Sequence, residues 1–325
     1  SFYGRGGMNT DWKGGTATFD PDGPGPAPVM TFPGTFGAGN AGVDLSQAFL
    51  DVTWAWQVTD TLSLGVSPVL AMQLFEAKGV GSFAGFTETF AASGGTEFPS
   101  NLSNNGSEFS WGYGAKVGLH AAFTDSFSFG LMYQSRLNMT EFDDYADLFA
   151  EQGDIDIPAH LKAGLTWKAR ENVALSFDIE HTWFSDVDAV GNSIANIAGC
   201  PTAGFDGMNL SNCLGGDNGA GFGWDDQTTY KFGVQWGNGG DWTWRAGYSF
   251  TDQPIPDTEM TFNILAPAVV EDHYTFGLTR ALASGNDWSL AFMYAPSNSQ
   301  TGPQNFDPTQ SVTWKMKQYE IEFSY

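Results

Sequence analysis

The sequence predicts an all-β protein, a single antiparallel transmembrane β-barrel that occupies residues 1–325. Three observations lead to this fold class: apolar and polar side chains alternate along most of the chain, aromatic residues are frequent, and short and long connections alternate. Residues 319–325 show the strictest alternation and end in an aromatic side chain, Tyr325. Such an ending is typical of bacterial outer-membrane β-barrels.

The alternation indicates strands, because successive side chains of a strand point to opposite faces. It is strongest at 127–138, where one face is apolar and the other is polar. A soluble β-sandwich would alternate in the same way, so the period alone does not decide. Each predicted strand has about ten residues, enough to cross a hydrocarbon core when tilted by about 45°. Twelve strands are expected, at 2–12, 45–58, 61–75, 109–123, 126–140, 157–168, 172–184, 228–237, 241–252, 271–282, 286–295 and 312–325.

The aromatic content favours a membrane protein. Aromatic residues make up 15% of the chain, with 12 Trp and 27 Phe. A soluble core needs far fewer, whereas aromatic girdles flank the apolar band of a transmembrane barrel. No apolar run approaches the roughly 18 residues of a membrane-spanning helix. A barrel is the other structure that satisfies its backbone hydrogen bonds within lipid, so we expect a barrel.

The connections between the predicted strands alternate in length. Short turns with Gly, Asn or Asp, which suit hairpins, are expected at 59–60, 124–125, 169–171, 238–240 and 284–286. Short periplasmic turns and long extracellular loops are typical of outer-membrane barrels. The long loops are expected at 13–44, 76–108, 141–156, 185–227, 253–270 and 296–311.

Two of the long loops carry apolar side chains at helical spacing. Residues 141–153 have the pattern of a short amphipathic helix above the barrel rim, and 76–108 contains similarly spaced phenylalanines. The two segments could pack on each other, or they could form a groove for apolar ligands. The candidate substrate-binding residues are Phe83, Phe86, Phe90, Tyr145, Leu148 and Phe149.

The predicted inner face of the barrel is charged, and the first strand is rich in glycine. Charges of both signs on one wall indicate a cross-paired lumen, or a role in conduction or ligand binding. Glycines at 4, 6 and 7 indicate a bulge or bend near the rim, or a gap in the wall. The inward residues are expected to be Lys116, His120, Arg136, Lys162, Asp178, Glu180, Lys231 and Arg245.

The charge balance and the two cysteines limit the classes of partner and cofactor that the protein is expected to bind. The formal net charge is -24, from 37 acidic and 13 basic residues, which argues against nucleic acid. The acidic loops are expected to form a solvated surface, or to bind divalent cations shared with lipopolysaccharide. No other cofactor and no metal site are expected. Cys200 and Cys213 predict a disulfide in one loop, because no histidine between them could complete a zinc site.

The sequence carries no sign of an enzyme. The four histidines lie on different predicted strands, and none has the spacing of a metal ligand or of a base that activates a nucleophile. The short motifs of hydrolases, phosphate-binding loops and zinc proteases are absent. We therefore expect a non-catalytic protein.

Several segments resemble FadL-type outer-membrane transporters of long-chain fatty acids and other hydrophobic compounds, a family that includes the TodX-like aromatic-hydrocarbon channels. The Trp-Gly-Tyr-Gly run of one strand is similar to a strand of that family, and so is the run Asp-Trp-Thr-Trp-Arg-Ala-Gly-Tyr of a later one. The resemblance extends over essentially the whole chain, through the segments 110–118, 133–136, 157–161, 241–248, 252–257 and 271–274.

The resemblance implies a fourteen-stranded barrel that is closed by an N-terminal hatch. Ligand would be captured between the loops 76–108 and 141–156 and would leave sideways through a gap in the wall, near Gly6 and Gly7. The hatch and the first two strands of the family have no counterpart in the twelve strands predicted here, so we expect an N-terminal portion to be missing.

A second difference concerns the substrate. Basic residues that meet a carboxylate in some family members are not found at the matching positions, where Leu74, Glu76, Asp225 and Asp226 occur. Burial of an anion without a cationic partner is energetically costly, so this difference favours neutral hydrocarbons as substrates.

The predicted function is passive uptake of long-chain fatty acids or hydrocarbons across the bacterial outer membrane. The alternatives are a general polar porin and a structural or adhesive protein with acidic surface loops. The expected partners are membrane lipid, lipopolysaccharide and a hydrophobic small molecule, and a monomer is expected rather than an oligomer.

Overall fold

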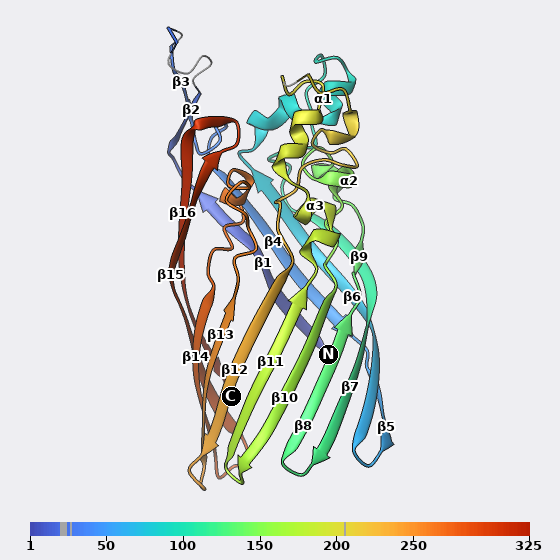
Figure 1. Ribbon diagram of the computed structural model, residues 1–325, viewed down its shortest axis with the longest axis vertical. Helices are drawn as coiled ribbons and strands as arrows, with labels where there is room; N and C mark the ends of the chain where they lie inside the picture. Colours follow the sequence, from blue (N-terminus) through green and yellow to red (C-terminus); the bar gives the residue numbers. More distant parts are fainter. Residues whose placement is uncertain (20–24, 27, 205) are drawn as a thin grey trace.

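The computed structural model describes residues 1–19, 25–26, 28–204 and 206–325. One large antiparallel sheet forms a tilted wall, in the order β1-β4-β6-β7-β8-β10-β11-β12-β13-β14-β15-β16 (Figure 1). The short strands β5 and β9 extend it beside β6 and β7, and β2 and β3 form a separate hairpin. The strands are β1 (Phe2–Trp12), β2 (Thr16–Phe19), β3 (Met30–Pro33), β4 (Ala41–Asp51), β5 (Trp54–Thr59), β6 (Leu62–Lys78), β7 (Glu108–Thr124), β8 (Phe127–Gln134), β9 (Asn138–Met139), β10 (His160–Arg170), β11 (Val173–Thr182), β12 (Gln227–Gly237), β13 (Trp242–Thr251), β14 (Asp272–Ala281), β15 (Asp287–Gln304) and β16 (Asp307–Ser324).

The twelve predicted strands correspond to the twelve strands of the main sheet order. The two extra strands arise because two predicted strands are interrupted. The segment 45–58 is divided into β4 and β5, and 126–140 into β8 and β9. The antiparallel barrel wall predicted from the alternation is therefore confirmed.

The two faces of the wall differ as predicted. Large apolar side chains on one face are exposed, including Trp167 at 52%, Phe276 at 42% and Ile321 at 72%. The opposite face carries paired polar groups, such as Lys116 and Asp51 on β7 and β4. Exposed apolar side chains are stable against lipid, so the outward face is the lipid-facing one.

The connections separate into two ends (Figure 1). The five tight turns predicted from the sequence lie at one end. The described helices lie in the long connections at the other end, where the β15–β16 hairpin also has its turn. Among the described residues, no helix is long and apolar enough to cross a membrane. The helices are the 3-10 helices η1 (Gly81–Phe86), η2 (Asp143–Tyr145), η3 (Phe184–Asp186), η4 (Ile194–Gly199), η5 (Leu210–Asn212) and η6 (Phe262–Ile264) and the α-helices α1 (Glu88–Ala92), α2 (Ala150–Gly153) and α3 (Asp188–Gly191).

The prediction of a long loop at 296–311 is wrong. Strands β15 and β16 continue as a paired hairpin up to Gln304 and Asp307. Polar side chains occupy both faces of this extension, which therefore lacks the apolar alternation that marked the other strands. The loop 13–44 likewise contains the β2–β3 hairpin, and β4 already begins at Ala41.

The amphipathic helix predicted at 141–153 is also wrong. The segment forms only η2 and α2, and within α2 the residues Glu151 and Gln152 have φ angles of 53° and 56°. Their backbone N–H groups donate to the carbonyls of Gly216 and Gly215, at 3.2 and 3.0 Å. Pairing with the neighbouring loop thus replaces the intrahelical bonds that the side-chain spacing suggested.

The main hydrophobic core lies among the long connections rather than within the lower wall. It joins residues of β4 and β6, such as Val43 and Phe75, to residues of five connections, including Phe83, Phe149 and Phe222. A smaller cluster inside the wall contains Phe49, Val69 and Leu137. We call the larger cluster, which contains Val43, Phe75, Phe83, Phe149, Phe222 and their buried neighbours, the loop core.

Candidate functional site

Strand β1 has a bulge at Gly7 and Met8. Its register with β4 shifts between Gly6, which is paired with Ser46, and Asn9, which is paired with Asp44. A Cβ atom on Gly7 would lie 2.1 Å from the carbonyl oxygen of Leu45, so only glycine allows this close approach. The irregularity predicted from the glycines of the first strand is confirmed. A lateral opening at Gly6 and Gly7 stays a prediction.

A cavity of about 420 Å³ lies against this bulge. Its volume falls within the range of about 300–1,000 Å³ that is usual for small-molecule sites. It is bounded by β1 and β4, by the end of the connection 141–156, by β11 and β12, and by the connection between β11 and β12. The lining residues are Arg5, Gly6, Gly7, Met8, Leu45, Gln47, Ile155, Asp156, Ile157, Pro158, Glu180, Thr182, Phe184, Val190, Phe222, Trp224, Gln227 and Thr229.

The six candidate substrate-binding residues lie outside this cavity. Phe83, Tyr145, Leu148 and Phe149 are almost fully buried in the loop core. Phe86 stacks on Phe306 at the tip of the β15–β16 hairpin, with ring centroids 5.1 Å apart. Thus the two loops do pack on each other, the first of the two possibilities considered above. Their contact with substrate stays a prediction.

Two further contacts place the candidates relative to the cavity. The ring of Phe149 lies 6.0 Å from that of Phe222, which lines the cavity, so the loop core forms its roof. Phe90 is farther out, paired with Phe98 at 5.2 Å, and Phe98 is 74% exposed. Phe98 thus exposes an apolar side chain on the outer part of the connection 76–108.

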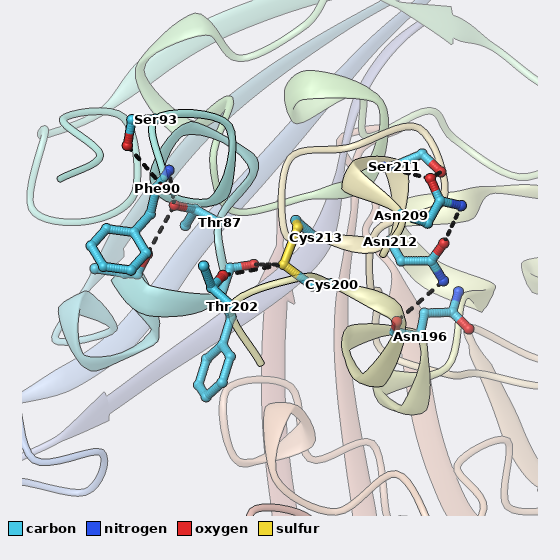
Figure 2. Close-up of a disulfide and its surroundings, with 12 residues drawn as sticks. Thr87, Phe90, Ser93, Asn196, Cys200, Thr202, Asn209, Ser211, Asn212 and Cys213 are labelled. Atoms are coloured by element: carbon cyan, nitrogen blue, oxygen red, sulfur yellow. Dashed lines mark hydrogen bonds between the residues drawn. A yellow bond between two sulfur atoms is a disulfide. The ribbon is translucent and has the colours of Figure 1, made fainter. Parts of the chain in front are cut away.

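The predicted disulfide is present. Cys200 and Cys213 are joined across a separation of 13 residues (Figure 2). The next residue, Leu214, forms a β-bridge with Thr87, whose hydroxyl accepts a hydrogen bond from the backbone N–H of Phe90 at the start of α1. The disulfide thereby braces the connection 185–227 against the connection 76–108.

Six of the eight predicted inward residues pair across the inner wall, namely Lys116, Arg136, Lys162, Glu180, Lys231 and Arg245. Lys116 lies 2.6 Å from Asp51, and Glu180 lies between Lys231 at 2.6 Å and Lys162 at 2.9 Å. Arg136 pairs with Asp156, a carboxylate that also accepts from the backbone N–H of Met139. Lower in the wall, Arg245 donates to Gln235 and Thr279. His120, Asp178 and Lys162 line a second cavity along the wall.

Acidic side chains gather in the loops. Burial is the main cause that raises the pKa of Asp154 to about 7, with the nearby carboxylate of Asp156 adding to it. Burial also raises the pKa of Glu88, followed by the charges of Asp217 and Asp147. In the part of the chain that the structure describes, no three His, Cys, Asp or Glu side chains are grouped to hold a metal ion. Divalent cations at these loops stay a prediction.

Sequence reasoning missed the aromatic lining of the cavity. Phe184 and Trp224 pack edge to face, with ring centroids 5.1 Å apart, and Phe222 lies beside Trp224 at 6.5 Å. These residues flank the glycine-rich connection between β11 and β12. The signal that could have found them is the Gly-Phe-Gly-Trp run at 221–224, two aromatic residues in an otherwise polar segment.

These features define an outer-membrane β-barrel with a cavity between its wall and its loops. The family described as outer membrane protein transport protein (OMPP1/FadL/TodX) matches residues 8–313, and the chain belongs to this family. It is therefore a multi-pass protein of the bacterial outer membrane. The family consists of transport channels for hydrophobic compounds and not of enzymes.

Solved structures share the fold. The toluene transporter TodX of Pseudomonas putida aligns with a TM-score of 0.57 and 15% identity, covering 98% of this chain and 76% of TodX. The toluene transporter TbuX of Ralstonia pickettii aligns at 0.54 and 14%, covering 99% and 75%. A Pseudomonas aeruginosa FadL homologue aligns at 0.55 and 15%, covering 97% and 72%. No curated protein sequence matches the chain.

Proposed function

We propose that the protein mediates passive uptake of hydrophobic molecules across the outer membrane. The cavity carries this proposal, because it lies between the apolar loop core and the bulge of β1. Molecules would gather on the loops 76–108 and 141–156, enter the cavity and leave sideways at Gly6 and Gly7. The substrates would be long-chain fatty acids first, with alkane or aromatic hydrocarbons close behind.

The energetics suit transport. Removing apolar surface from water contributes roughly 25 cal/mol per Å², so many weak contacts can capture a hydrophobic molecule without holding it irreversibly. Two of the structurally similar proteins are toluene transporters, which supports a hydrophobic small molecule as substrate. A barrel that delivered such a molecule sideways would place it directly in lipid.

The lateral route can be tested at Gly6. This residue lies on the lipid-facing side of β1, as Phe2 does, and a Cβ atom there meets nothing within 4 Å. We expect Gly6→Trp to cover the opening and to reduce uptake of radiolabelled oleate and of toluene by whole cells to the level of cells without the protein.

The matched control is Gly4→Trp. Gly4 lies on the same face of β1, two residues further from the bulge. A Cβ atom there would be 3.7 Å from the carbonyl oxygen of Gln47, an ordinary contact. Uptake should be unchanged in this variant. Normal uptake by Gly6→Trp, at equal surface expression, would remove the lateral route at this bulge.

Conductance separates the proposal from a polar porin. Because the charges of the inner wall are paired and the loop core lies above them, we expect almost no ionic conductance in planar lipid bilayers. A large steady current would instead support a general porin.

A further inference from the structure

Arg280 lies on the lipid-facing side of the wall, at the end of the tight turns. It is the last residue but one of β14. It shares the outward face with Phe276, because the two positions are four residues apart in a strand whose pairing has no register shift. The side chain of Arg280 is exposed. Since the tight turns of an outer-membrane barrel are periplasmic, Arg280 lies near the periplasmic leaflet of the membrane.

Two tryptophans flank Arg280 on this face. Trp242 is the first residue of β13 and Trp288 is the second of β15, and each is paired directly with Arg280 across the sheet. The guanidinium carbon lies 5.3 Å from the ring centroid of Trp242, a cation–π contact. The two indole rings pack edge to face, with centroids 5.6 Å apart. The aromatic pair therefore holds the cation in the interfacial belt, where tryptophan is favoured.

The polar groups of this cluster have no partner within the part of the chain that the structure describes. There, no acidic group lies at ion-pair distance from Arg280. Hydrogen bonds from indole N–H groups are made by other tryptophans and not by Trp242 or Trp288. By contrast, Arg245 on the inner face donates to two neighbouring side chains. Arg280 and the two indoles thus direct unused donors toward the membrane.

An unpaired cation at the membrane interface favours an anionic lipid headgroup. The planar guanidinium matches two oxygens of a phosphate, and such charge-assisted bonds are stronger than neutral ones. The exposed rings of Phe276 and Phe292, on the same face toward the middle of the wall, would lie along the acyl chains. The chain as a whole repels anions, because its formal net charge is -24. A preference for an anionic lipid would therefore come from a local cation such as Arg280.

We propose that Arg280, Trp242 and Trp288 form a binding site for the headgroup phosphate of an anionic phospholipid in the periplasmic leaflet. The guanidinium binds the phosphate oxygens, and the indole N–H groups donate to oxygens of the headgroup or of the ester groups. The site shares no residue with the cavity against the bulge of β1. It therefore goes beyond the proposed uptake function and does not depend on it.

The test uses two lipids with the same acyl chains, the anionic dioleoylphosphatidylglycerol and the zwitterionic dioleoylphosphatidylcholine. Each is titrated into the purified full chain in detergent, and native mass spectrometry counts the lipid molecules that stay bound. We expect the unsubstituted protein to retain the anionic lipid preferentially. Arg280→Gln should weaken its binding roughly ten- to hundredfold, and binding of the zwitterionic lipid much less. Arg280→Lys, which keeps the charge but not the planar donor set, should keep part of the preference.

The matched control is Arg245→Gln, which removes the same charge from the inner face of the wall. It should leave the affinities for both lipids unchanged. All variants are compared as folded barrels, identified by their heat-dependent gel mobility. Equal affinities for the two lipids in the unsubstituted protein, or an equal loss in Arg280→Gln and Arg245→Gln, would overturn the site. Displacement of the anionic lipid by excess inorganic phosphate would also overturn it, because a soluble anion would then suffice as ligand.

Discussion

Asp154 is a half-buried carboxylic acid, and few groups near it could neutralise its charge. One of its oxygens has no hydrogen-bond partner among the described residues, and the nearby Arg136 is engaged by Asp156. Burial first, and then the charges of Asp156 and Glu151, raise its pKa to about 7. Ionisation of Asp154 therefore destabilises the folded connection 141–156, which ends at the cavity.

The sign of the pH dependence follows from this shift. The pKa in the folded protein, about 7, lies above the ordinary value of 3.8, so the folded loop binds the proton more tightly than the unfolded loop does. The stabilisation is complete below the ordinary value and is lost as the pH rises through about 7.

We therefore expect the backbone of 141–156 to exchange hydrogen faster at about pH 8 than at about pH 5, after correction for intrinsic exchange rates. Asp154→Asn should remove most of this difference. Asp143→Asn, which changes an exposed carboxyl of the same loop, should keep it. Equal protection at both pH values in the unsubstituted protein would contradict the prediction.

At the scale of single residues, the sequence predicted the features that depend on residues close together in the chain. The disulfide could be predicted because Cys200 and Cys213 are close in the chain, and the glycines of β1 marked a real bulge. The cavity could not be predicted, because Arg5, Asp156 and Trp224 come from distant segments. Only the order of the strands brings these residues together.

At the scale of elements, the connection 185–227 depends on its cross-link. The disulfide holds Leu214 in place, and the backbone of Leu214 bonds to both Phe86 and Glu88. Loss of the bond would loosen two connections at once. The disulfide is thus expected to stabilise the loops and not the wall.

A double variant, Cys200→Ser with Cys213→Ser, tests this expectation. A bond that closes a loop of about this length contributes about 3 kcal/mol on the chain-entropy account. We expect an added protease to cleave 185–227 much faster on intact cells, while the heat-dependent gel mobility of the folded barrel stays the same. Unchanged cleavage would show that the packing of the loop core suffices.

The elements also show where side-chain patterns fail. The strands within lipid were predictable because one face meets hydrocarbon and the other does not. At 296–311 both faces are polar, so the extended β15–β16 hairpin had no apolar alternation. At 141–153 the apolar spacing suited a helix, but bonds from Glu151 and Gln152 to the next loop determined the backbone.

At the scale of the whole molecule, the outward face of the wall determines where the protein can reside. Phe276, near the middle of β14, is exposed on this face, whereas its neighbour Thr275 points to the opposite face. A charge on the lipid side must leave water on insertion, and one on the lumen side does not.

Phe276→Arg should therefore destabilise the barrel in lipid vesicles by about 2–4 kcal/mol, the usual cost of Arg near the bilayer midplane. Thr275→Arg is the matched control and should cost much less. The free energy of unfolding in urea, measured in the same vesicles, checks both variants. Similar values for the two would contradict the assignment of the faces.

The tip of the β15–β16 hairpin has a consequence for how the protein matures. Phe306 contacts Phe83 and Phe86, at 5.5 and 5.1 Å, so the last hairpin of the chain supports a connection near its beginning. These contacts of the loop core are then formed only after β15 and β16 have been synthesised and inserted. A barrel stalled before this step would lack the aromatic contacts that support the connection 76–108, which we propose as part of the capture site.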